Sequence, residues 1–90
     1  IITPQNQKPQ KIVLSFSAHQ SKYIKTFPFH ASQQIISDND NELKIQLHLI
    51  ITYDFIMELL SYADDVKIIA PASLRKTIYQ RLLKAVSLYS

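Results

Sequence analysis

Residues 43–71, LKIQLHLIITYDFIMELLSYADDVKIIAP, decide the fold of this chain. In residues 43–51, apolar side chains alternate with mostly polar ones, and this period of two predicts a strand with one buried face. The period changes at Thr52, a favourable N-cap residue, and Asp54 follows where the first helical turn would lie. We therefore expect a helix to begin there. It would bury a stripe made of Ile56, Leu59, Leu60 and Ala63. The β-branched run 66–70 predicts a second strand, which Pro71 closes because proline donates no backbone hydrogen bond.

The rest of the chain supplies three more elements before this stretch and one helix after it. Residues 11–17 alternate like a strand, and Ser17 with Gln20 fits a capping box for a helix over residues 18–26. The inward residues of that helix are expected to be Tyr23, Ile24 and Phe27. Residues 34–37 read as a strand, and the Asx-rich residues 38–41 predict a hairpin turn. A last helix over residues 72–89 is expected to face inward with Leu74, Ile78, Leu82, Ala85 and Tyr89.

The predicted order is βαββαβ followed by one further helix. Two crossovers joined by a hairpin indicate an α+β fold, a ferredoxin-like sandwich with both crossover helices on one face. Residues 1–10 carry two prolines and little to bury, so they predict a linker, and residues 11–90 predict the domain. The last helix is extra: it could cover the open face or an edge, or pack on a second copy, and Leu83 is one of its surplus apolar side chains.

Composition excludes several classes of protein. The 90 residues suffice for one small domain. The absence of cysteine rules out disulfides and thiolate metal sites, and the absence of glycine rules out a glycine-rich phosphate loop. No apolar run approaches the roughly 18 residues of a membrane span. The absence of cysteine also suits a reducing cytoplasm, where we expect the protein to work. The chain does not begin with methionine, so we expect it to belong to a longer protein.

Charge is distributed unevenly along the chain, whose net charge is +3. Residues 1–37 carry four Lys and no acid, residues 38–65 carry seven acids and one Lys, and residues 66–90 carry five Lys or Arg and no acid, giving +4, −6 and +5. A basic end could meet phosphates or an acidic partner. Complementarity within the chain explains the same pattern equally well.

Candidate binding residues lie at two places. His30, Ser32 and Gln33 offer donors and acceptors at the entrance to a strand, although Ser32 and Gln33 could simply satisfy nearby backbone groups. Arg75 would lie in the first turn of the last helix, where a cation opposes the helix dipole. Either an effector phosphate or an ion pair with Asp64 or Asp65 would account for it.

Other patterns favour ordinary structural roles. Lys76, Arg81 and Lys84 could follow a nucleic-acid backbone but fit a solvated helix face. The aromatic residues Tyr23, Phe27, Phe29 and Tyr53 could stack bases but are more typical of a core. The histidines lack metal-ligand spacing, and no pair of groups suggests acid–base catalysis. We therefore expect no enzyme activity, no metal and no cofactor.

Several motifs, in order, resemble a known family: IKTFPFHASQ (24–33), DFIMELLSYADDVKII (54–69), PASLRKTI (71–78) and the closing Tyr89. Together they are similar to the C-terminal extension domain of WYL-domain transcriptional regulators. The chain differs from the usual family pattern at Ala31, Ala63 and Ala70. Glycine is common at the position of Ala63, and alanine there costs about 1 kcal/mol more if the residue must be left-handed.

The resemblance implies a bacterial regulator in which a winged helix-turn-helix binds DNA, an Sm-like WYL domain follows, and this ferredoxin-like extension closes the chain. It implies a role in effector sensing and oligomerisation, with a nucleotide or single-stranded nucleic acid as effector. We assign effector binding to His30, Ser32, Gln33 and Arg75. A purely structural dimerisation module without a ligand is the alternative.

Overall fold

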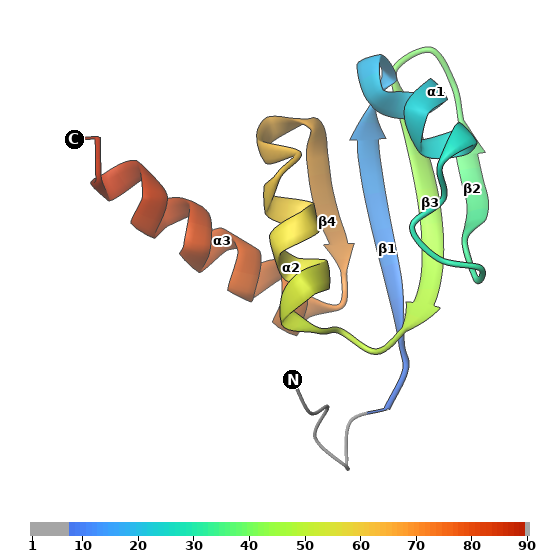
Figure 1. The fold of residues 1–90 in the computed structure, drawn as a ribbon. Helices are drawn as coiled ribbons and strands as arrows, with labels where there is room; N and C mark the ends of the chain where they lie inside the picture. The colour runs from blue at the N-terminus through green and yellow to red at the C-terminus, as the bar shows by residue number, and fades with distance from the viewer. Residues whose placement is uncertain (1–7, 90) are drawn as a thin grey trace.

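The computed structural model describes residues 8–89, which form one four-stranded antiparallel sheet and three α-helices (Figure 1). The α+β prediction is confirmed, and the strand order is β2-β3-β1-β4. The strands are β1 (Gln10–Ser17), β2 (Gln34–Asp38), β3 (Glu42–Leu49) and β4 (Val66–Ala70). The helices are α1 (Ala18–Thr26), α2 (Tyr53–Leu60) and α3 (Ala72–Ser87). Most of the linker predicted for residues 1–10 lies outside the described residues, and β1 already begins at Gln10.

The core lies on one face of the sheet, as the period of two predicts. Strand β1 is central, and its Leu14 pairs with Ile45 of β3 on one side and Ile68 of β4 on the other. The buried rows of the strands join side chains from all three helices in one cluster. The helix contributions to this cluster are Ile24, Phe55, Leu59, Leu74 and Ile78.

Helix α1 begins where the sequence predicts but without the predicted capping box. Ser17 makes no side-chain cap hydrogen bond. Its hydroxyl instead donates to Asp65 Oδ1 at 2.9 Å, and Gln20 Nε2 donates to Asp65 Oδ2 at 3.2 Å. One carboxylate 48 residues away from Ser17 therefore replaces the local motif. The inward face is also narrower than predicted, because only Ile24 of α1 is buried, whereas Tyr23 and Phe27 are exposed.

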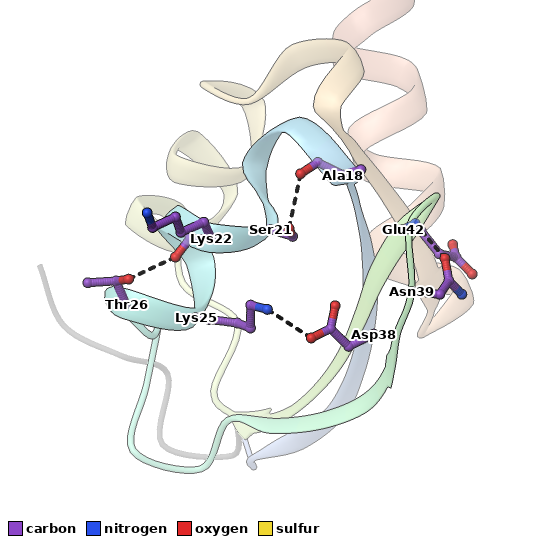
Figure 2. A network of polar contacts seen from close by, with 8 residues as sticks. All are labelled: Ala18, Ser21, Lys22, Lys25, Thr26, Asp38, Asn39 and Glu42. Atoms are coloured by element: carbon purple, nitrogen blue, oxygen red, sulfur yellow. Dashed lines mark hydrogen bonds and ion pairs between the residues drawn. The ribbon is translucent and has the colours of Figure 1, made fainter.

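The predicted hairpin between β2 and β3 is present and is tied to α1. Asn39 Oδ1 accepts hydrogen bonds from the backbone N–H groups of Asn41 (2.8 Å) and Glu42 (2.9 Å), which is the expected Asx turn. Figure 2 shows how Lys25 of α1 reaches the end of β2, where its Nζ lies 2.8 Å from Asp38 Oδ2. This contact joins the helix to the end of β2 that precedes the hairpin turn.

Helix α2 begins as predicted, with the Thr52 Oγ1 accepting from the Phe55 N–H at 3.2 Å. Its buried residues are Phe55 and Leu59, while Ile56 and Leu60 pack at the margin of the core. The predicted stripe is wrong at its end, because Ala63 lies beyond the helix. Ala63 has a left-handed φ of 49° and opens a short 3₁₀ turn, Ala63–Asp65.

Helix α3 packs on the body of the domain through its first half only. Leu74 and Ile78 are buried, and every residue from Tyr79 to Tyr89 is exposed. The predicted inward positions Leu82, Ala85 and Tyr89 are therefore wrong. Figure 1 shows the reason: α3 runs away from β4 and the sheet, so its second half passes beyond the core.

Candidate functional site

The segment between α1 and β2 is held in shape by the side chain of Gln33. Its Oε1 accepts from the Phe29 N–H at 2.9 Å, and its Nε2 donates to the Ile24 carbonyl at 3.3 Å. The Gln33 N–H also donates to the His30 carbonyl at 3.0 Å. Two of these hydrogen bonds lie within the segment and the third connects it to α1, so residues 29–33 form a defined loop.

Ser32 attaches the same loop to strand β3. Its Oγ accepts from the His48 N–H at 2.9 Å and lies 3.1 Å from the His48 carbonyl and 2.8 Å from His30 Nδ1. The Ser32 N–H donates to His30 Nδ1 at 3.1 Å. Because Nδ1 is an acceptor in this arrangement, a neutral His30 carries its proton on Nε2. Ser32 and Gln33 thus do satisfy nearby backbone groups, and by doing so they orient the exposed His30 ring.

His30 lines a hollow of about 510 Å³ where the loop, the end of β3 and the beginning of α2 meet. Phe29 and Phe55 supply apolar surface, and His30 and His48 supply ring nitrogens. The full lining is Pro9, Phe29, His30, His48, Leu49, Ile50, Thr52, Asp54, Phe55 and Glu58. Since its carboxylates come from Asp54 and Glu58, this hollow suits a planar ligand with hydrogen-bonding edges better than a bare phosphate.

A second hollow, of about 390 Å³, is also lined by His30. Its lining includes Lys25, Ala31 and Gln33, so its one charged side chain is a cation. His30 is shared by both hollows. The first hollow has acidic and aromatic lining residues, and the second has Lys25, whose Nζ is also paired with Asp38.

Arg75 lines neither hollow, so the structure does not bring it together with His30. It is exposed in the first turn of α3, where its N–H donates to the Pro71 carbonyl at 3.0 Å. Among residues 8–89, the ion pairs are Lys25–Asp38 at 2.8 Å and Lys44–Glu42 at 3.9 Å. The alternative ion pair of Arg75 with Asp64 or Asp65 is thus not formed there.

The aromatic residues divide between core and surface. Phe29 packs among the core rings, as the core interpretation predicts. That interpretation is wrong for Tyr23, Phe27 and Tyr53, which are 53%, 61% and 55% exposed. Tyr23 and Phe27 pack on each other with ring centroids 5.0 Å apart, and the Arg81 guanidinium lies 5.6 Å above the Tyr53 ring.

Tyr62 closes the core beside the loop, in contact with Phe29 at a centroid distance of 5.7 Å. Burial raises the pKa of its phenol above the ordinary value of 10.0, and the nearby Tyr23 and Glu58 raise it further. The phenol is therefore neutral at physiological pH, and it contributes no charge to the hollows.

The sequence did not point to His48, Asp54 and Glu58 as lining residues. His48 lies on β3, and Asp54 and Glu58 lie on α2. The folded chain brings them beside the loop, although they are far from it in the sequence. In the described part of the chain, no group of three or more His, Cys, Asp or Glu side chains is placed to hold a metal ion. No helix there is long and apolar enough to span a bilayer.

The fold is a small α+β module with two hollows that share the His30 loop. Residues 8–86 match the WCX domain family, and the chain belongs to that family, the C-terminal extension of WYL-domain regulators. The resemblance seen in the sequence is thereby confirmed. A comparison with curated proteins found no match.

Proposed function

We propose that this WCX domain senses an effector for a WYL-domain regulator and binds it at the His30 loop, with no catalytic role of its own. The effector is a nucleotide or a single-stranded nucleic acid, and the regulator works in the bacterial cytoplasm. The observation that carries the proposal is the oriented His30 ring, fixed by Ser32 and shared by two hollows of different charge.

The chemistry of the two hollows suits the two halves of a nucleotide. A base would lie against Phe29 and Phe55 and accept from His30 Nε2, since ring edges carry acceptors and aromatic faces stack. The attached phosphate would lie toward Lys25, away from Asp54 and Glu58. Arg75 lies outside the hollows, so it would contact a phosphate only of a longer single-stranded nucleic acid that continues toward α3.

The strand order β2-β3-β1-β4, with α1 and α2 as the crossover helices, supports a ferredoxin-like interpretation of the fold. In that interpretation α3 is an addition to the sandwich. The winged helix-turn-helix and WYL domains of the same protein would be neighbours of this module in the regulator, and the sheet face opposite the core would be available to contact them.

A fluorescence-anisotropy titration with a short labelled single-stranded oligonucleotide tests the proposal. Binding should occur at low salt and weaken as salt rises, because phosphate contacts release counterions. His30→Ala should weaken binding about tenfold, the loss of one well-placed stacking or hydrogen-bonding contact, and Arg75→Ala should reduce the salt dependence. His19→Ala is the matched control, because His19 is exposed on α1 and lines neither hollow. Absence of binding at low salt, or equal losses for His30→Ala and His19→Ala, would contradict the proposal.

Self-association is the second candidate function, either beside effector sensing or as the only role of the domain. The observation that favours it is the exposed second half of α3, which carries apolar side chains beyond the core. A purely structural module would still self-associate when Arg75 or His30 is replaced.

A further inference from the structure

The larger hollow carries one hydrogen-bond donor whose position is fixed by the loop. The Ser32 N–H donates to His30 Nδ1 at 3.1 Å, so a neutral His30 ring has its proton on Nε2. Among residues 8–89, both hydrogen-bond contacts of this ring involve Nδ1, so the Nε2–H group remains for a ligand. The ring of His48 is not fixed in this way, because its hydrogen bonds to Ser32 use the backbone. His30 therefore supplies the one donor of defined position.

The same hollow carries two carboxylates that lie on one face of α2. Asp54 and Glu58 are both exposed, both line the hollow and are four residues apart, the spacing of neighbours on a helix surface. The two ion pairs among residues 8–89 involve other acids. An ionised carboxylate only accepts hydrogen bonds, and its two oxygens can accept from two neighbouring N–H groups at once. A ligand that fits this hollow therefore has adjacent donors.

Glu58 is the carboxylate that lies closer to the His30 loop. Burial raises the pKa of the Tyr62 phenol, and the charge of Glu58 raises it further, so Glu58 is near that ring. The Tyr62 ring in turn lies 5.7 Å from the ring of Phe29, the residue before His30. Asp54 lies one turn earlier on α2, in its first turn, where the helix dipole already stabilises a negative charge.

We propose that this hollow selects guanine as the base of the effector, with His30 Nε2 donating to O6 and the Glu58 carboxylate accepting from N1–H and the N2 amino group. The Watson–Crick edge of guanine presents an acceptor followed by two donors. His30 and Glu58 together present a donor followed by two acceptors, the order that cytosine presents in a base pair. The inference rests on the proposed function, because it names the base that the His30 hollow takes.

The other bases do not match this order. Adenine and cytosine each have one amino group next to a ring acceptor, and thymine and uracil have one N–H between two carbonyl groups. Each of them would place an acceptor opposite a Glu58 oxygen and leave a hydrogen bond unmade. The rings of Phe29 and Phe55 do not discriminate, because every base has an aromatic face that can stack. A two-bond contact to one base edge favours the correct base by about tenfold or more.

Fluorescence-anisotropy titration with a matched set of oligonucleotides tests the selection. Each is a short labelled oligothymidine strand whose central base is guanine, hypoxanthine, adenine or thymine. Because the strands have the same number of phosphates, their electrostatic attraction to the chain is equal at a given salt concentration. The guanine strand should bind about tenfold more tightly than the adenine and thymine strands. Hypoxanthine lacks only the N2 amino group of guanine, so its strand should bind about threefold more weakly than the guanine strand.

Two variants test whether Glu58 reads the base. Glu58→Gln keeps the size of the side chain but replaces one acceptor with a donor, so the ratio of guanine to adenine affinity should fall from about ten toward one. Loss of the negative charge strengthens binding of all strands alike, which leaves this ratio unaffected. Asp40→Asn is the matched control. It makes the same change of charge in the exposed hairpin turn, lines neither hollow and should keep the ratio.

The outcomes separate base selection from effector binding itself. Equal affinities for all four strands would overturn the selection of guanine and leave effector binding in place. Equal affinities for guanine and hypoxanthine would show that the N2 amino group is not read, and would overturn the two-bond contact. A preference for guanine that survives Glu58→Gln, or that Asp40→Asn reduces equally, would also overturn the proposal. Absence of binding by every strand at low salt would overturn the proposed function and the selection together.

Discussion

Replacing Ala63 with glycine should stabilise the domain, although the substitution removes a methyl group and adds chain flexibility. Ala63 connects α2 to the 3₁₀ turn with a φ of 49°, in the left-handed region. A Cβ in this region lies too close to the following carbonyl oxygen, whereas glycine has no Cβ. The side chain is exposed, so its loss removes no core packing.

The expected size follows from two opposing terms. Relief of the left-handed strain contributes about 1–2 kcal/mol, and the greater freedom of glycine in the unfolded chain costs about 0.4–1 kcal/mol. The net gain is about 0.5–1 kcal/mol, which raises the midpoint of thermal unfolding by roughly 2–8 °C in a domain of this size.

Thermal and urea unfolding monitored by circular dichroism measure this gain. Ala85→Gly is the matched control, because Ala85 is also exposed but lies inside α3 with helical geometry. There glycine should lower the free energy of unfolding by about 1 kcal/mol. The reasoning is refuted if Ala63→Gly leaves the midpoint unchanged or lowers it, because the left-handed geometry would then carry no strain.

Three further outcomes follow from the same structure. Thr52→Ala removes the acceptor for the Phe55 N–H and should lower the urea-unfolding free energy by about 1 kcal/mol, whereas Thr52→Ser should largely preserve it. Leu59→Ala, at a fully buried position, should cost about 2–5 kcal/mol and leave the small domain partly unfolded at room temperature. The folded chain holds the Tyr62 proton more tightly than the unfolded chain, so this residue's contribution to stability should be lost as pH rises above 10.0. Tyr62→Phe should show a shallower alkaline decline in denaturant titrations, and an identical decline would contradict this account.

Local signals in the sequence predicted most of the fold because the physics behind them is local. Alternation placed β1 and β3, a β-branched run placed β4, the Thr52 hydroxyl placed the start of α2, and the Asx residues placed the hairpin turn. The left-handed conformation of Ala63 was anticipated only through the family resemblance. Each of these features depends on residues within a few positions of one another.

Errors arose where distant segments decide the outcome. The side chains of Ser17 and Gln20 donate to Asp65 instead of forming a capping box. No local sequence pattern predicts a partner so far along the chain. The inward face of α3 depends on where the core ends, so periodicity alone could not tell that Leu82 lies beyond it. The predicted site shows the same division. His30 and its supports are neighbours in sequence, whereas His48 joins them only through strand pairing.

The separation of acidic and basic segments along the chain is better explained by a binding partner than by ion pairs within the domain. Complementarity between the acidic middle and the basic end could have explained the −6 and +5 segments as internal pairing. Among residues 8–89, Lys25–Asp38 does join the basic first segment to the acidic middle, but neither ion pair involves a cation from residues 66–89. Asp65 accepts from a hydroxyl and an amide instead. Exposed ion pairs would contribute only about 0–1 kcal/mol each in any case, so folding gives little reason for this segregation. A better reason is that the charges attract or orient a partner. Charges of one sign on a projecting helix, without ion-pair partners, act beyond the surface of the domain.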